Sequence, residues 1–180
     1  MANLLYVDNS NVWIEGMRVA AVQNGLCPDI WSAVHNRICD NSWKLDFGKL
    51  FRFAGGESME VKKATLFGSK PPQNDSVWEA AKRKGFDVIT YDRNIVNHEK
   101  KIDTDIVATM IEDSYEILEV GKDEMTLVAG DSDYVPAIKK LKHRGIPVHV
   151  VFWFHASREI KESATKFIDL DPYLKNLCRQ

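Results

Sequence analysis

Cysteine is scarce in this chain, and its spacing excludes two classes of protein. Only Cys27, Cys39 and Cys178 occur in 180 residues, an odd number without the paired spacing of a zinc site. The same scarcity excludes the disulfide framework of a small secreted domain. Three unpaired cysteines are typical of reduced thiols in a cytosolic protein, so we expect a cytoplasmic location.

Long apolar runs and an excess of charge are also missing. No run approaches the roughly 20 apolar residues that cross a bilayer, and the one before Asp8 is too short for a signal peptide. We therefore expect no membrane partner. The net charge of −2 gives no bulk attraction to nucleic acid. A polyanionic partner would have to be held by a local basic patch or through a metal ion.

The common catalytic signatures are missing as well. The chain has no histidine pair, cysteine cluster, Gly-x-x-x-x-Gly-Lys loop or Gly-x-Ser-x-Gly elbow. His155 is the one histidine at the end of a predicted strand, and we interpret it as a polar residue that ends the strand. Any catalytic chemistry must then come from other side chains, chiefly carboxylates.

The length fits one domain spanning residues 1–180, and the order of its segments predicts an α/β fold. Apolar stretches that lack clean alternation predict parallel strands covered on both faces. Helical patterns lie between them and end next to Gly25, Gly85, Gly121 and Gly145, where glycine favours a left-handed cap. Strand alternating with helix predicts an open sheet with right-handed crossovers. The strands are expected at Leu4–Val7, Val61–Phe67, Phe86–Tyr91, Met125–Ala129 and Pro147–Phe154, and the helices at Asn11–Asn24, Asp75–Lys84, Asp103–Val120 and Tyr134–Arg144.

The stretch from about 26 to 56 is too long for a simple connection. It contains Trp31, Trp43 and a short helical pattern at Phe47–Phe53. We interpret it as an insertion packed on the surface of the domain. A lid over a functional site is the alternative.

Two of the predicted strands end on an aspartate. Asp8 ends the run "LLYVD", and Asp131 follows the run "LVAGD". The carboxyl ends of parallel strands meet at one edge of the sheet, where ligands bind at the point of strand-order reversal. Aspartate also commonly caps the helix after such a turn, and we assign that role first to Asp133, before the predicted Tyr134 helix.

A third acid lies at the predicted start of a helix. Ile106, Val107 and Met110 belong to one apolar stripe at 100° per residue, and Asp103 falls near the middle of that stripe. Asp105 falls on the opposite face. An inward carboxylate is costly unless a charge meets it. Asp103 as a helix N-cap is the alternative, and the two roles are compatible.

Three inward carboxylates would repel one another, and a divalent cation would remove the conflict. Oxygen ligands of this kind suit Mg²⁺ or Mn²⁺ rather than zinc. Asn11 and Ser132 are placed to add neutral oxygens or to hold a water.

Three segments, "LLYVDNSNVW", "KKIDTDIVATMIEDSY" and "LVAGDSDYVPAIKKLKHRGIPVHVV", resemble the signature segments of the NYN domain in its LabA-like branch. This family belongs to the PIN-like nuclease superfamily. The resemblance runs in order from about Asn3 to Val151 and leaves 26–56 unmatched. It implies a Rossmann-like three-layer α/β/α sandwich with a mainly parallel sheet of about five strands, a carboxylate-bound Mg²⁺ or Mn²⁺, and hydrolysis of RNA.

The family's functional residues map onto this chain one by one. Its metal-binding acids fall on Asp8, Asp103 and Asp131, with Asp133 as an additional catalytic acid and Asn11 as the polar residue of the site.

One position departs from the family pattern. Many members carry a further acid about six residues after the Asp103 position, and Thr109 stands there in this chain. Asp113 is a candidate substitute. The departure leaves open whether the site holds one metal ion or two.

RNA, most simply single-stranded, needs cations near this acidic edge. Five basic residues lie after predicted strand ends or just before the Asp103 helix, and we expect them to contact the phosphate backbone. They are Lys70, Arg93, Lys100, Lys101 and Arg158.

Two other functions stay open at this stage. Asp8-Asn9-Ser10-Asn11 loosely resembles the Asp-x-Ser-x-Ser metal loop of von Willebrand A domains, which bind partners through Mg²⁺ without cleaving them. The fold of the family could also serve as a non-catalytic metal-binding or RNA- or protein-binding module, which the Thr109 departure favours. The sequence also leaves a homo-oligomer open.

Overall fold

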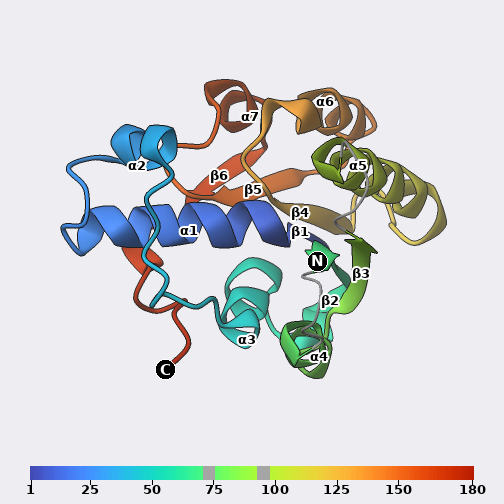
Figure 1. The fold of residues 1–180 in the computed structure, drawn as a ribbon. Helices are drawn as coiled ribbons and strands as arrows, with labels where there is room; N and C mark the ends of the chain where they lie inside the picture. The colour runs from blue at the N-terminus through green and yellow to red at the C-terminus, as the bar shows by residue number, and fades with distance from the viewer. Residues whose placement is uncertain (71–75, 93–97) are drawn as a thin grey trace.

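The computed structural model of this chain describes residues 1–70, 76–92 and 98–180, with the side chains of Lys70 and residues 98–100 outside the description. Six parallel strands form one sheet in the order β3-β2-β1-β4-β5-β6 (Figure 1). The strands are β1 (Ala2–Asp8), β2 (Val61–Lys70), β3 (Asp87–Asp92), β4 (Asp123–Val128), β5 (Val148–Phe152) and β6 (Lys166–Asp169).

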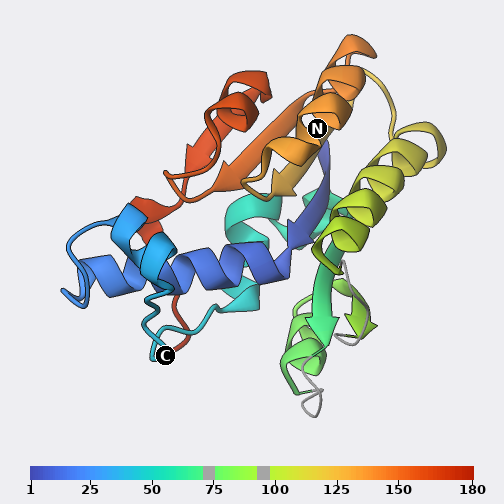
Figure 2. The same ribbon diagram turned by 45° about the horizontal axis from the view of Figure 1, so that its top comes forward.

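Helices cover both faces of this sheet, which makes a three-layer α/β/α sandwich. In Figure 1 the helices α5, α6 and α7 lie above the sheet and α3 and α4 lie below it, and the turned view of Figure 2 keeps the same layers. The α-helices are α1 (Asn9–Gln23), α2 (Ile30–Asn36), α3 (Phe47–Leu50), α4 (Ser76–Arg83), α5 (His98–Glu116), α6 (Val135–His143) and α7 (Arg158–Ser163); the remaining short helices are η1 (Phe51–Gly55), η2 (Ser58–Glu60), η3 (Ser132–Tyr134) and η4 (Asp171–Tyr173). Within the described ranges no helix is long and apolar enough to cross a membrane.

The predicted fold class is confirmed, with one strand more than expected. Each of the five predicted apolar stretches contains or overlaps one of β1–β5. The sixth strand, Lys166–Asp169, is short and only partly buried at the sheet edge, so its sequence carries little apolar signal. The four glycines predicted to end helices all have φ between +74° and +104°, as a left-handed cap requires.

The strand order fixes where a ligand site belongs. β1 lies between β2 and β4, so the chain runs outward from β1 through β2 to β3 and then returns to the other side of β1. A crevice therefore opens beyond the carboxyl ends of β1 and β4. Asp8 is the last residue of β1, and Asp131 lies three residues beyond the last residue of β4.

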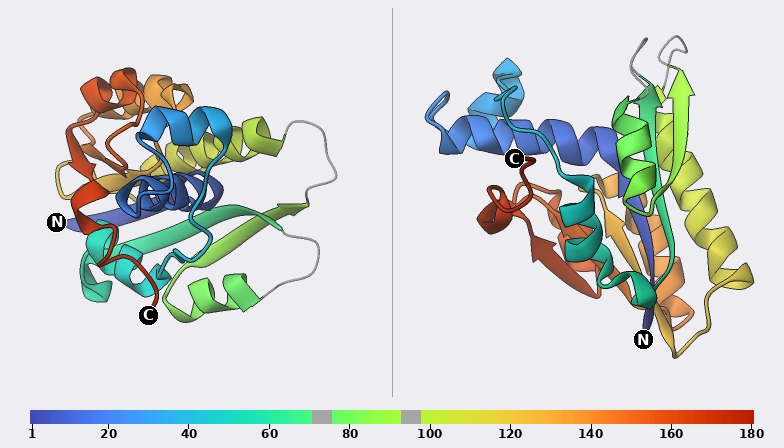
Figure 3. Two further views of the ribbon diagram at one scale, coloured as in Figure 1. Left: turned by 60° about the vertical axis from the view of Figure 1, so that its left-hand side comes forward. Right: turned by 90° about the horizontal axis from the view of Figure 1, so that it is seen from below.

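Helix α1 leaves the end of β1 at a steep angle and passes the carboxyl ends of β5 and β6 (Figure 3, right). Trp153, which follows β5, is fully buried and donates its indole N–H to the carbonyl of Val12 at 2.9 Å. The indole of Trp43 packs edge-on against Trp153, with ring centroids 5.7 Å apart. These two tryptophans hold α1 across the edge of the sheet, so one face of α1 borders the crevice.

The segment 26–56 divides into two parts. The part from Trp43 to Phe51 supplies buried aromatic and aliphatic side chains to the main core, which supports the interpretation as a packed insertion. The earlier part forms α2, which packs on α1 through a small separate cluster around Cys27 and Ala33. No described residue of this segment lines the pocket described below, so it does not cover the acidic residues as a lid.

Gly16 tests this placement of α1, because a Cβ there would lie 2.6 Å from the Trp43 ring and 2.7 Å from the Trp153 ring. Helix propensity alone predicts that Gly16→Ala stabilises the protein by about 1 kcal/mol. Overpacking predicts the opposite sign, and we expect a net loss of about 1–3 kcal/mol in the free energy of unfolding. Urea denaturation measures it, and a stabilised Gly16→Ala variant would contradict this packing.

Candidate functional site

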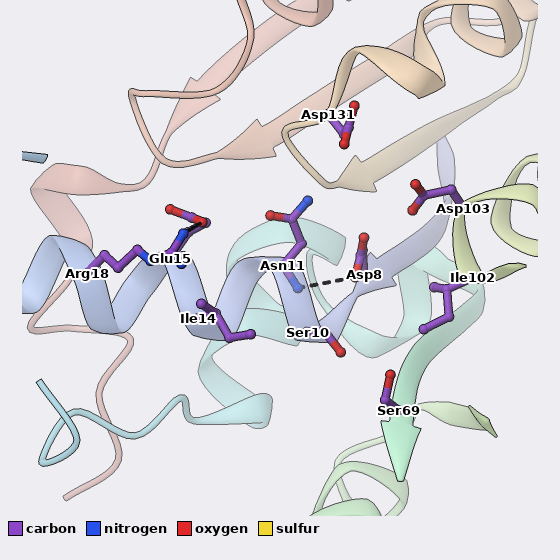
Figure 4. Close-up of a pocket in the computed structure, with 10 residues that line it drawn as sticks. All are labelled: Asp8, Ser10, Asn11, Ile14, Glu15, Arg18, Ser69, Ile102, Asp103 and Asp131. Carbon is purple, nitrogen blue, oxygen red and sulfur yellow. Dashed lines mark hydrogen bonds and ion pairs between the residues drawn. The ribbon is translucent and has the colours of Figure 1, made fainter. Parts of the chain in front are cut away.

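A pocket of about 580 Å³ lies at the crevice predicted by the topology. Figure 4 shows Asp8, Asp103 and Asp131 directed toward a common space from β1, α5 and the end of β4. The pocket continues along one face of α1. Its lining residues are Asp8, Ser10, Asn11, Ile14, Glu15, Arg18, Ser69, Ile102, Asp103 and Asp131.

Asp8 is both a cap and a member of the site. Its carboxylate is buried and accepts a hydrogen bond from the backbone N–H of Asn11 at 3.2 Å, which starts α1. The cap fixes the side chain at the end of β1, and it uses Oδ1. The second oxygen, Oδ2, lies 3.2 Å from the hydroxyl of Tyr134.

Asp103 is not a helix cap, and the predicted start of its helix was wrong. α5 begins at His98, so Asp103 lies within the helix. Ile102 is buried and lies one turn before Ile106, so the apolar stripe extends beyond the predicted start. Asp103 is half-buried and its carboxylate accepts a hydrogen bond from the Tyr134 hydroxyl at 2.8 Å. The inward orientation inferred from the stripe is what the structure has.

The capping role assigned to Asp133 was also wrong, because Asp131 performs it. Asp131 accepts a hydrogen bond from the backbone N–H of Asp133 at 3.0 Å and caps η3, while α6 begins without a side-chain cap. Asp133 is exposed beside it. Carboxylate oxygens of Asp103, Asp131 and Asp133 lie within 4.8 Å of one another. These three acids form the carboxylate cluster of the site.

Tyr134 joins Asp8 to this cluster, and sequence reasoning missed it. Its side chain is fully buried beneath the pocket, and its hydroxyl bridges Asp8 and Asp103. Burial and the nearby carboxylates raise the pKa of the Tyr134 phenol far above its usual range, so it stays a proton donor. The signal in the sequence was the tyrosine directly after "GDSD", but an aromatic residue at that position is also typical of a hydrophobic core.

Burial raises the pKa of the Asp8 carboxyl to about 7, and the charge of Asp103 adds to the effect. Hydrogen bonds from Asn11 and Tyr134 act in the opposite direction. The ionised form of Asp8 is therefore destabilised as long as only these neighbours surround it. A cation at the cluster would favour the ionised form.

The donor set fits a small hard cation. All the candidate ligand atoms are carboxylate oxygens, as Mg²⁺ and Mn²⁺ prefer. Two ligands on opposite sides of one Mg²⁺ are about 4 Å apart, so a cluster within 4.8 Å needs only small side-chain movements to hold one ion. A cation bound there would also stabilise the ionised form of Asp8, which burial disfavours.

The remaining predicted residues of the site have different positions. Asn11 lines the pocket, and Ser132 is half-buried in η3 outside the pocket lining. Asp113 does not replace the acid missing at Thr109. It is buried, and it accepts hydrogen bonds from Lys63 at 2.8 Å and from the Tyr6 hydroxyl at 2.7 Å. A carboxylate paired in this way is not available as a ligand.

Of the five predicted RNA-binding cations, only Lys101 and Arg158 have described side chains. Arg93 lies outside the described residues, as do the side chains of Lys70 and Lys100. Lys101 is exposed, with its ammonium 5.4 Å from the centroid of the Tyr91 ring. Arg158 is exposed and pairs with Glu162 one turn along α7.

The pocket has a cation that was not predicted. Arg18 lines it together with Glu15, and these two form an ion pair on α1. Asn11, Glu15 and Arg18 are spaced by four and three residues, which places them on one helical face. Extending the analysis of Asn11 along its helix would have found them.

A parallel α/β sandwich with acids at its switch point is a Rossmann-like fold, and PIN-like proteins have folds of this kind. The model of the NYN domain matches residues 9–171, so this chain belongs to the NYN domain family, within the PIN-like nuclease superfamily. This assignment overturns the alternative of a von Willebrand A domain. A crystal structure of a protein of unknown function from Vibrio parahaemolyticus has the same fold, with a TM-score of 0.66 and 16% identity over 94% of this chain and 92% of that one. No curated protein matches this chain significantly.

The raised pKa of Asp8 predicts how the stability of the metal-free protein depends on pH. An unfolded aspartate titrates near pH 3.9, and folded Asp8 near pH 7, so the folded state binds more protons between these values. The free energy of unfolding should fall as pH rises through this window, by up to about 4 kcal/mol from this group. Asp8→Asn should remove that slope and be the more stable protein at about pH 8 in EDTA. Asn caps a helix about as well as Asp. An unchanged slope in urea titrations of Asp8→Asn would contradict this prediction.

Tyr134→Phe tests whether the hydroxyl positions the acids. Loss of a hydrogen bond to charged groups should lower the free energy of unfolding by about 1–3 kcal/mol. Mn²⁺ affinity, measured by calorimetry, should fall about 10- to 100-fold, as for other partners that orient ligands. Tyr6→Phe is the matched control, since its hydroxyl serves Asp113. That variant should lose stability and keep its Mn²⁺ affinity, whereas equal Mn²⁺ affinities in the two variants would exclude the positioning role.

Proposed function

We propose that this chain is a Mg²⁺- or Mn²⁺-dependent ribonuclease that hydrolyses phosphodiester bonds of single-stranded RNA. The observation that carries the proposal is the convergence of Asp103, Asp131 and Asp133, with Asp8 linked through Tyr134, at the switch point of a PIN-like fold. Membership of the NYN family supports a nuclease, and the donor chemistry supports a hard divalent cation.

The proposed roles keep the ligand set that the family resemblance implies, with Asp8 joined to the cluster through Tyr134 and Asp133 beside Asp131. Asp8, Asp103 and Asp131 would hold the cation, which supplies Lewis-acid polarisation of the phosphate and an acidified water when it is bound. Asp133 is exposed next to Asp131 and would orient the attacking water. Asn11 lines the pocket beside Asp8 and would hold a water or a phosphate oxygen through its amide. Tyr134 would keep two of the acids in place without touching the substrate.

A non-catalytic binding module on the same fold is the second candidate. It is favoured by Thr109 at a position where many members have an acid, and by the engagement of Asp113 with Lys63 and Tyr6. A site with fewer acids suits one cation better than two. Cleavage of RNA with Mn²⁺ separates the two candidates, since a binding module would retain RNA without cutting it.

The test of catalysis compares two neighbouring aspartates on α5. Asp103→Asn should lower Mn²⁺-supported cleavage of a labelled single-stranded RNA by about 100-fold or more, as loss of a group that stabilises developing charge does. Asp105→Asn is the matched control, because Asp105 does not line the pocket. It should stay within about twofold of the unmodified protein. EDTA should abolish the activity of all three proteins. Full cleavage by Asp103→Asn would refute the site as assigned.

A further inference from the structure

The α1 side of the pocket leads away from the acids to a cation and an exposed tryptophan. Asn11, Ile14, Glu15 and Arg18 form this wall, and it extends about 10 Å along the helix axis from Asn11 to Arg18. Stacked nucleotides in a strand are about 3.4 Å apart, so this length suits about three of them. Ile14 is 41% exposed, which leaves an apolar surface in the middle of the wall.

Arg18 has hydrogen-bond capacity that its ion pair does not use. Figure 4 shows its side chain directed back along α1 toward Glu15, and so toward the acids. Nη1 donates to Glu15, whereas Nε is buried and has no hydrogen-bond partner among the described residues. A guanidinium carries five N–H donors in a planar fork that matches a phosphate. A small turn of the guanidinium toward the pocket would bring this donor to a bound phosphate oxygen.

Glu15 and His155 connect this cation to the α2 segment. The Nε2 atom of His155 lies 2.5 Å from Glu15, so Glu15 contacts Arg18 on one side and the imidazole on the other. The ring of Trp31 on α2 lies edge-on to the imidazole, with centroids 6.3 Å apart and an interplanar angle of 84°. Trp31 therefore contacts His155, which in turn contacts Glu15 at the end of the pocket wall.

Trp31 contributes little to the core, because most of it is exposed. Its side chain is 65% exposed, whereas Trp43, Trp78 and Trp153 are at most 5% exposed. The T-shaped contact with His155 covers only part of the indole, and most of the residue is open to solvent. Stacking of a base on such a ring is tolerant of sequence and stabilises binding by single-stranded nucleic acid.

We propose that α1 is the track of single-stranded RNA leading to the acids, with Arg18 binding a backbone phosphate and Trp31 stacking on a base beyond it. The proposal rests on the proposed nuclease function of the same pocket and adds the path of the substrate. It also assigns a function to the α2 part of the 26–56 segment, because α2 carries Trp31 although it does not line the pocket. The base that stacks on Trp31 must be unpaired, so the proposal requires single-stranded RNA at that position.

Equilibrium binding tests the track separately from catalysis. A fluorescein-labelled single-stranded RNA of mixed sequence is titrated with each protein in EDTA, where no cleavage occurs, and anisotropy is measured. Trp31→Ala should raise Kd about 5- to 100-fold, and Trp31→Phe should stay within about threefold of the unmodified protein. Tyr115→Ala is the matched control, since Tyr115 is 70% exposed on the far part of α5 and should leave Kd unchanged. Arg18→Gln should weaken binding and reduce the slope of log K against log salt by about 0.7, one released counterion.

Cleavage kinetics with Mn²⁺ then distinguish failure of the track from failure of the nuclease. Trp31→Ala should raise KM and leave kcat at saturating RNA within about twofold, because Trp31 lies away from the acids. An unchanged Kd and KM in Trp31→Ala, in a protein that cleaves RNA, would overturn the track alone and favour a protein-docking role for Trp31. Weakened binding without any cleavage would retain the track and reject the nuclease. Absence of RNA binding in the unmodified protein would overturn the track as well.

Discussion

The buried carboxylate of Asp8 is the constraint on which this structure depends. It ends the central strand, caps the helix that leaves that strand, and lies against the Tyr134 hydroxyl. Burial and the neighbouring Asp103 raise its pKa to about 7, because the ionised carboxylate is less stable in this position than in water. A cation at the cluster would offset that loss. A buried carboxyl with a raised pKa at a topological switch point is typical of a functional site rather than of a scaffold.

The same region shows how one set of side chains serves folding and function. Asp8 and Asp131 cap helices with their carboxylates, and both residues also line the pocket. Tyr134 belongs to the core through its ring and to the site through its hydroxyl. Trp153 holds α1 across the sheet edge and so places the pocket wall. Changes here should therefore affect stability and binding together, and matched controls are needed to separate the two.

The sequence predicted the parts of the fold that come from local patterns. Five apolar stretches located five strands, and glycines with positive φ marked the helix ends. The acids at strand ends located the pocket, because parallel topology brings such residues together. The short β6 and the true start of α5 were missed, since Lys166–Asp169 and residues 98–101 are largely polar and have no strong periodic signal.

Contacts between distant segments were beyond the reach of sequence patterns. The bridge from Tyr134 to Asp103, the ion pair of Asp113 with Lys63, and the contact of His155 with Glu15 each join residues far apart in the chain. Capping roles were also misassigned, because Asp131 and Asp133 have the same chemistry two positions apart and only backbone geometry separates them. The predicted basic patch stays a prediction, since only Lys101 and Arg158 of its five residues have described side chains, and the pocket cation found among the described residues, Arg18, was not predicted.

The most direct test of the account is the position of Mn²⁺ in crystals of this protein, located by its anomalous scattering. The account predicts a single strong peak bounded by Asp8, Asp103 and Asp131, with oxygens at about 2.1 Å from the ion. It also predicts that the peak disappears in crystals of Asp131→Asn. An empty pocket at saturating Mn²⁺, or a peak at another cluster of acids, would contradict the assignment of this pocket as a metal-dependent active site.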